Sequence, residues 1–274
     1  MDHNIQTHSP PLAYGDFPYA PERPAPSAKA PAKSLAFSMV SGASYVSLGM
    51  NQLLSECAPD GECCAITRNV KPIEACHLIG KATKSDLQAK IESAWGTETG
   101  QFSTNCVANL IWLTRDMHNL FDDDHWALVP TRAVLTEMMA FNTVRPKPKP
   151  YNEMFPDEIR EFHYVQFKSL PAFIMQFTDN KLRNFPQYSS EAGLPAPAQP
   201  EIDFPAYEIH RYPFESLGVI KSHAHPFFVT YNTGQKMHRL RKANGDLQLP
   251  PHANNYLFEL GLSEALYNSW MGST

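Results

Sequence analysis

Two stretches carry the clearest structural signal in this sequence: CCAITRNVKPIEACHLIG (residues 63–80) and NLIWLTRDMHNLFDDDHWALVP (residues 109–130). The first stretch contains two apolar runs of strand length, at 63–67 and 74–79. They are joined closely enough to pair as antiparallel strands. The first stretch therefore predicts a β-hairpin.

The second stretch predicts a helix between two extended runs. An apolar run at 110–113 leads to Thr114, which caps a helix that continues to about Phe121, and 125–129 has the pattern of a strand. Between the two stretches, SDLQAKIESAWG (85–96) predicts an inserted helix that opens with a capping box and stops at its glycine. The resulting order is strand, strand, inserted helix, short run, helix, strand.

The rest of the chain divides around this unit. We expect a proline-rich N-terminal arm (1–33), a domain over 34–141 with its motif core at 63–130, and a C-terminal extension (142–274) that packs on the core. Further predicted elements are a helix over 45–57, a helix over 157–167, a strand-like run at 227–231 and a final helix at 262–270.

Composition excludes several classes of protein. The 274 residues are 43% hydrophobic, enough to bury a core, and the formal net charge of −5 lacks the global basicity of an architectural nucleic-acid binder. No apolar run reaches the length of a membrane span, and the first residues do not resemble a secretory signal. We therefore expect an intracellular protein, cytoplasmic or nuclear.

Five cysteines without a CxxC pair fit reduced thiols better than a disulfide framework or a four-cysteine zinc site.

One group of residues predicts chemistry. His77 lies near the end of the second strand, Asn109 precedes the later helix, and His118 and Asp122 are four apart on that helix. Positions i and i+4 share one helix face, so an imidazole and a carboxylate can reach the same ion. A helix with nitrogen and oxygen ligands, facing a strand that carries a histidine, suits a divalent metal and the hydrolysis of a phosphodiester.

These residues and their order resemble the HNH endonucleases, and most closely the HNH domain of many fungal proteins. The resemblance covers about residues 63–130, and the steps from Asn109 to His118 and on to Asp122 occur within the family. It implies an α+β fold built on a ββα-metal core, here with an N-terminal helix and a mixed C-terminal extension. It also implies His77 as general base, Asn109 as the residue that braces the base loop, and His118 as metal ligand.

The residue before the general base departs from the family pattern. That position usually holds an Asp or His that also binds the metal, and here it is Cys76. A thiolate suits zinc better than magnesium, so either the metal differs or fewer protein groups hold it. We expect one divalent ion, with Mg²⁺ or Mn²⁺ as the first choice and Zn²⁺ or Ni²⁺ as alternatives. Glu74 is a second carboxylate on the strand, and strand alternation predicts that it faces away from His77.

Two other groups are weaker candidates. Basic residues that could contact nucleic acid are Arg68, Arg115, Lys236, Arg239, Arg241 and Lys242. His223 and His225 share a face if that segment is extended, although packing is the favoured interpretation because no third ligand is evident. His125 is considered only for a supporting contact.

The leading hypothesis is metal-dependent hydrolysis of DNA or RNA. Two alternatives remain: an HNH-fold metalloenzyme recruited for a small molecule or peptide, and a catalytically silent protein that binds nucleic acid or a partner. The sequence does not indicate an oligomeric state.

Overall fold

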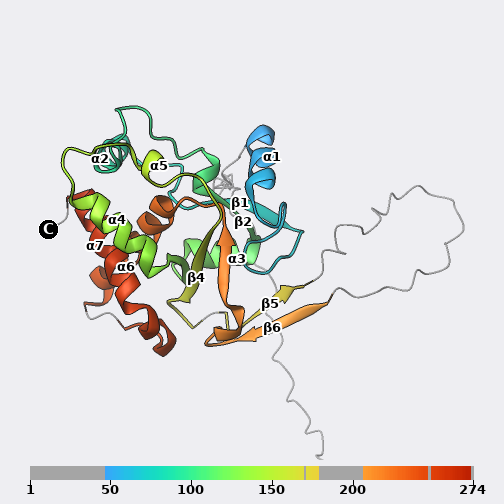
Figure 1. Cartoon of the computed structure of the whole chain (residues 1–274). Coiled ribbons are helices and arrows are strands. Elements are labelled where there is room, and N and C mark those ends of the chain that lie inside the picture. Colours follow the sequence, from blue (N-terminus) through green and yellow to red (C-terminus); the bar gives the residue numbers. More distant parts are fainter. Residues whose placement is uncertain (1–46, 170, 179–205, 246–247, 273–274) are drawn as a thin grey trace, which may run out of the picture. The chain divides into compact units, whose positions relative to one another are not determined.

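The computed structural model describes residues 47–169, 171–178, 206–245 and 248–272 (Figure 1). The predicted arm over 1–33 and the first residues of the helix predicted over 45–57 lie outside this part of the chain. With 3-10 helices written η, the elements are α1 (Leu48–Cys57), β1 (Ile73–His77), α2 (Ser85–Trp95), η1 (Val107–Asn109), β2 (Leu110–Thr114), α3 (Arg115–Asp122), β3 (Trp126–Pro130), α4 (Arg132–Thr143), α5 (Tyr151–Met154), β4 (Arg160–Gln166), β5 (Phe173–Phe177), β6 (Tyr207–Arg211), η3 (Glu215–Leu217), β7 (Val219–Ser222), α6 (Pro226–Asn244), η4 (Pro251–Tyr256) and α7 (Leu257–Met271).

A ββα unit stands at the centre of the fold. Strands β1 and β2 pair antiparallel, with His77 opposite Leu110 and Ile73 opposite Thr114. Thr114 has extended backbone angles and is the N-cap of α3, so the helix begins directly where β2 ends. This is the ββα arrangement of an α+β protein.

The predicted hairpin partner was wrong. Residues 63–67 form turns, and the partner of β1 is the apolar run at 110–113, more than thirty positions downstream. The amide of Ala65 still donates to the carbonyl of Trp112, so the turn segment lies beside β2 without becoming a strand. Local spacing favoured the nearer run, whereas the long connection through α2 determines the actual pairing.

Helix α2 confirms the predicted insertion. It ends at Gly96, whose φ of 73° lies in the left-handed region where glycine is favoured. The capping box was wrong, because Lys84 is the N-cap and Ser85 is already the first helical residue. Trp95 is fully buried and packs edge-on against aromatic rings that include Phe228 of α6.

A second, three-stranded sheet has the order β3-β4-β7, all antiparallel. Strand β4 replaces the helix predicted over 157–167. Phe162 and Val165 are three apart and fit a helical face, but β3 on one side and β7 on the other satisfy the backbone of β4 as a central strand. Strands β5 and β6 form a separate pair.

The C-terminal helices α6 and α7 pack side by side, as Figure 1 shows. The strand predicted at 227–231 was wrong, because this run lies inside α6. Phe227, Phe228, Val229 and Tyr231 are all buried around the helix, so the amphipathic period that would reveal a helix is absent. The final helix predicted at 262–270 is confirmed as part of α7.

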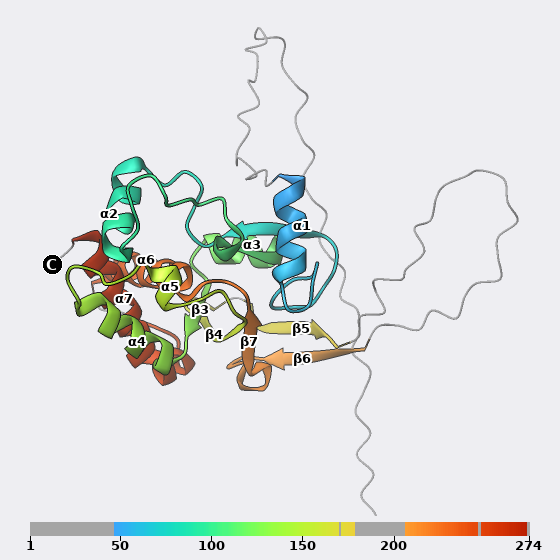
Figure 2. The same cartoon turned by 45° about the horizontal axis from the view of Figure 1, so that its top comes forward.

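One large hydrophobic core joins the ββα unit to the later helices. It contains Met117 and Phe121 of α3 together with Phe227 of α6 and Trp270 of α7. Helix α1 lies beside the ββα unit (Figure 2), and its Leu54 belongs to a smaller cluster with Leu110 and Trp112 of β2. No helix among the described residues has the length and apolar character needed to cross a membrane.

Candidate metal centre

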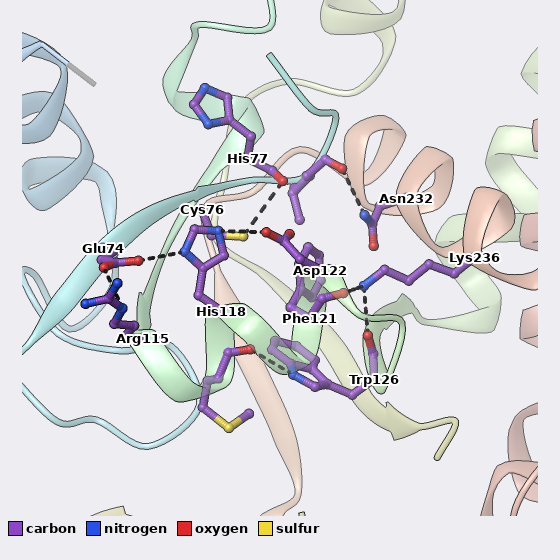
Figure 3. Close-up of polar contacts among 12 residues, drawn as sticks. Glu74, Cys76, His77, Arg115, His118, Phe121, Asp122, Trp126, Asn232 and Lys236 are labelled. Atoms are coloured by element: carbon purple, nitrogen blue, oxygen red, sulfur yellow. Dashed lines mark hydrogen bonds and ion pairs between the residues drawn. The ribbon is translucent and has the colours of Figure 1, made fainter. Parts of the chain in front are cut away.

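Three metal-ligating side chains meet between β1 and α3 (Figure 3). One ligand atom from each of Cys76, His118 and Asp122 lies within 4.8 Å of the other two. His118 Nε2 is 3.5 Å from an oxygen of Asp122. Within the described ranges, no other three histidine, cysteine or acidic side chains form such a group.

Local structure brings the three ligands together. Cys76 faces the main core and is opposite Ile111 of β2, which packs in the same core. Because α3 follows β2 without a loop, His118 lies one turn into the helix, beside the β1–β2 pair. Asp122 is the last residue of α3 and lies one turn beyond His118 on the same face.

Glu74 holds the imidazole of His118 from the other side. Its Oε2 lies 3.1 Å from His118 Nδ1, and its Oε1 lies 3.8 Å from the guanidinium of Arg115. A hydrogen on Nδ1 donates to this carboxylate, which leaves the Nε2 lone pair facing Asp122 and Cys76. The sequence predicted only that Glu74 faces away from His77, and the contact between Glu74 and His118 was not predicted. The two-residue step from Glu74 to Cys76 was the available signal, because residues two apart on a strand share a face.

His77 is buried but is not one of the three grouped residues. In Figure 3 its ring lies apart from the cluster, while its carbonyl oxygen is 3.8 Å from Cys76 Sγ. Burial lowers the pKa of His77 below its ordinary value, and the neighbouring Lys81 and His118 side chains act in the same direction. The ring is therefore held in its neutral form, the form that accepts a proton.

Asn109 is completely buried and ties down the loop that follows His77. Its side-chain oxygen accepts from the amide of Ile79 at 2.8 Å, and its amide donates to the carbonyls of Ile79 at 2.9 Å and Thr104 at 2.7 Å. Its own carbonyl accepts from the amide of Leu78. These bonds tie the loop after His77 to the segment just before β2.

The predicted contact of Lys236 with nucleic acid was wrong. Its side chain is 1% exposed, so it does not contact a polymer in solvent. The helical conformation of α6 turns Lys236 into the core.

The remaining predicted basic contacts are exposed. Four are paired with acids, namely Arg68 with Asp60, Arg115 with Glu74, Arg239 with Asp124 and Arg241 with Glu264. Lys242 is exposed near the end of α6.

Two other candidate histidines, His225 and His125, lie outside the group of three. His225 is the N-cap of α6, where its Nδ1 accepts from the amide of Phe227 and its Nε2 donates to the carbonyl of Phe155. The packing interpretation of His225 is therefore confirmed. His125 precedes β3, and its carbonyl accepts from the amide of Phe167.

The donor set fits a divalent ion of intermediate softness. Sulfur, nitrogen and oxygen donors together suit Zn²⁺ better than Mg²⁺, which prefers oxygen ligands alone. Burial raises the pKa of the Cys76 thiol well above its ordinary value, so an ion bound here would have to displace this proton. Asp122, 65% exposed in its side chain, opens the cluster to solvent.

Comparison with known proteins identifies this unit. The model of the HNH endonuclease family matches residues 64–129, which include β1, α2, β2, α3 and most of β3. No curated protein and no solved structure matches the chain. The matched segment contains every residue of the candidate metal centre together with His77 and Asn109. Residues 64–129 therefore form a domain of the HNH endonuclease family.

Proposed function

We propose that this chain is a metal-dependent nuclease that hydrolyses phosphodiesters of DNA or RNA. The observation that carries the proposal is the meeting of Cys76, His118 and Asp122, with the buried His77 directly following Cys76 in the chain. The partly exposed cluster favours a polymer substrate over a small molecule in an enclosed pocket.

Each side chain has a role in this proposal. Cys76, His118 and Asp122 hold the ion, which when bound supplies positive charge to the phosphate and the leaving oxygen. His77 accepts the proton of the attacking water, since a neutral imidazole in this position is a general base. Asn109 keeps the loop after His77 in place, and Glu74 keeps the ring of His118 in orientation.

Arg115 is the basic side chain placed closest to the cluster in sequence. Its side chain is 74% exposed, and it lies beside Glu74 at the start of α3. We infer that it contacts a phosphate next to the cleaved bond. This contact would make binding weaker as the salt concentration rises.

The ion is best assigned by the donor set. With a thiol among three protein ligands, we place Zn²⁺ first, and Mn²⁺ and Ni²⁺ next. Mg²⁺ fits this set least well, which revises the order expected from the sequence.

Cleavage assays test the proposal. The full chain is stripped with a chelator and incubated with supercoiled plasmid, single-stranded DNA or RNA and with Mg²⁺, Mn²⁺, Ni²⁺ or Zn²⁺. We expect ion-dependent cleavage that falls by a factor of about 100 or more in His77→Ala and His118→Ala. His238→Ala, a half-buried histidine of α6 outside the cluster, is the matched control and should retain activity.

Two results would overturn the proposal. Equal cleavage by the wild type and both variants would show that these residues do not perform the reaction. Metal binding without cleavage of any nucleic acid would instead favour the recruited enzyme or the silent binding protein.

A further inference from the structure

Helix α6 reaches the metal centre from more than a hundred positions away in the sequence. Three of its polar side chains, Asn232, Lys236 and Arg239, are spaced by four and three residues and so share one face of the helix. Each one bonds to the ββα unit or to the turn that follows it. Figure 3 shows two of them, Asn232 and Lys236, converging on the site from the same helix.

Lys236 closes the turn behind the metal ligand Asp122. Its Nζ donates to the carbonyl of Phe121 at 2.6 Å and to the carbonyl of Trp126 at 2.9 Å. Phe121 is in the last turn of α3, and Trp126 begins β3. The buried ammonium therefore joins the end of the helix that carries His118 and Asp122 to the start of the next strand.

The charge of this turn explains why a cation is needed there. Asp122, Asp123 and Asp124 follow one another at the C-terminal end of α3, where the helix dipole already places partial negative charge. Acidic side chains at that end are unfavourable, and the last carbonyls of a helix have no partner within it. Lys236 donates a hydrogen bond to the carbonyl of Phe121, and its Nζ lies 3.3 Å from the centre of the Phe121 ring. Burial lowers the pKa of Lys236 to about 7, whereas Asp124 and Asp122 favour its charged form.

Arg239 holds the same turn from the solvent side. Its guanidinium lies 2.6 Å from a carboxylate oxygen of Asp124, whose φ of 58° is in the left-handed region. An aspartate in that conformation is uncommon and requires contacts that maintain it. The two cations of α6 thus fix a turn that begins at a metal ligand.

Asn232 acts on the other arm of the unit. Its buried amide donates to the carbonyl of Leu78 at 2.9 Å, directly after the proposed general base His77. The same helix therefore contacts the strand side of the site through Asn232 and the helix side through Lys236.

We propose that α6 is part of the metal centre, with Lys236 as the positioning residue for Asp122 and Asn232 as the positioning residue for the loop after His77. This inference rests on the metal centre of the proposed function. It adds that α6, a helix outside the HNH segment, helps to maintain the separation between Cys76 and Asp122 that the ββα unit establishes.

Metal affinity tests this inference without relying on catalysis. The full-length wild type, Lys236→Met and Arg239→Met are titrated with Zn²⁺ against a chromophoric chelator, and with Co²⁺, whose visible absorption reports coordination by Cys76. Folding of each variant is verified by circular dichroism. The matched control is Lys90→Met, which removes another lysine hydrogen bond to a backbone carbonyl, that of Met271, away from the site.

We expect Lys236→Met to bind Zn²⁺ about 10- to 100-fold more weakly, as is usual when a residue that supports metal ligands is lost. Arg239→Met should lose affinity by a factor of about 3, and Lys90→Met should match the wild type. If Lys236→Met does not fold, Arg239→Met decides, because its side chain is half exposed and its removal disturbs the core less than removal of the fully buried Lys236.

The outcomes separate the two proposals. If folded Lys236→Met has wild-type affinity and an unchanged Co²⁺ spectrum, the role of α6 is overturned and the metal centre stays intact. If Lys236→Met does not fold, the same result for folded Arg239→Met has the same meaning. A wild type that binds neither ion would overturn the metal centre itself, and the inference with it.

Discussion

Oε2 of Glu74 lies 3.1 Å from Nδ1 of His118, although the two residues are 44 positions apart in the chain. The carboxylate comes from β1 and the imidazole from α3, so this contact spans the two elements that supply the candidate metal ligands. It determines which ring nitrogen is available to an ion.

Glu74→Ala should therefore weaken Zn²⁺ binding by a factor of about 10 to 100, because the His118 ring loses the partner that fixes its orientation. Glu74→Gln keeps an acceptor without the charge and should show a smaller loss. Titration against a chromophoric chelator measures both, with the exposed Glu153→Gln as control. Affinity that is the same in all four proteins would contradict the orienting role.

Cys76→Asp should change which ion the protein prefers. Replacing the thiol by a carboxylate gives a set of one nitrogen and two oxygen donors, which suits Mg²⁺ and Mn²⁺. We expect Zn²⁺ affinity to fall at least about 10-fold and cleavage with Mg²⁺ or Mn²⁺ to rise relative to Zn²⁺. The exposed Cys57→Ser is the control. An unchanged ion preference would show that residue 76 is not a ligand.

Asn109→Ala should lower the free energy of unfolding by about 2–4 kcal/mol, because the buried amide makes three hydrogen bonds whose partners would be left unsatisfied. Urea unfolding followed by tryptophan fluorescence measures the change. The exposed Asn105→Ala should stay within about 0.5 kcal/mol of the wild type. Similar stability of the two variants would argue against the bracing geometry.

His225 predicts a loss of stability in mild acid. Burial lowers its pKa from 6.5 to about 4. Protonation at Nδ1 would also break the cap of α6. The unfolded chain takes up the proton first, so the stability that neutral His225 contributes is present above about pH 6.5 and falls as the pH drops toward 4. The shift corresponds to about 3 kcal/mol.

His225→Asn keeps a side-chain cap without a titrating ring. The difference in unfolding free energy between wild type and His225→Asn should therefore change between pH 7 and pH 4 in the direction given above. A difference that is constant with pH would place the titration elsewhere.

Gly234→Ala should destabilise the fold by about 2–4 kcal/mol, because a Cβ at this position would lie 2.3 Å from the carbonyl oxygen of Ser263 in α7. Gly261→Ala in α7 has no atom within 4 Å of the added Cβ and should be neutral or slightly stabilising. The melting temperatures of the two variants separate the effect of close packing between α6 and α7 from the effect of helix propensity alone. Equal melting temperatures would contradict the packing of α6 on α7.

The sequence predicted those parts of the fold whose signals are local. Helix α2 has a clear period and ends at Gly96, and α3 begins at Thr114 directly after an apolar run. The site could be proposed for the same reason, because His118 and Asp122 are one helical turn apart. Cys76 was included from its place next to His77 within the motif.

The errors arose where tertiary contacts decide the structure. The partner of β1 depends on a long connection, and β4 is a strand because two neighbours pair with it. Helix α6 is buried on several sides, which removes the pattern that would identify it. The role of Lys236 could not be found from a basic run, since only the helical conformation turns that one residue inward.

The hydrogen bonds that α6 makes to Leu78, Phe121 and Trp126 span 110 to 154 positions of the chain. Contacts at such separations form late in folding, because a long loop must close before they contribute. During synthesis, the complete HNH motif is present long before α6 exists. On the proposed function, hydrolytic competence thus arises only after nearly the whole chain has been made and folded, so a chain interrupted before residue 226 would contain the motif but remain inactive.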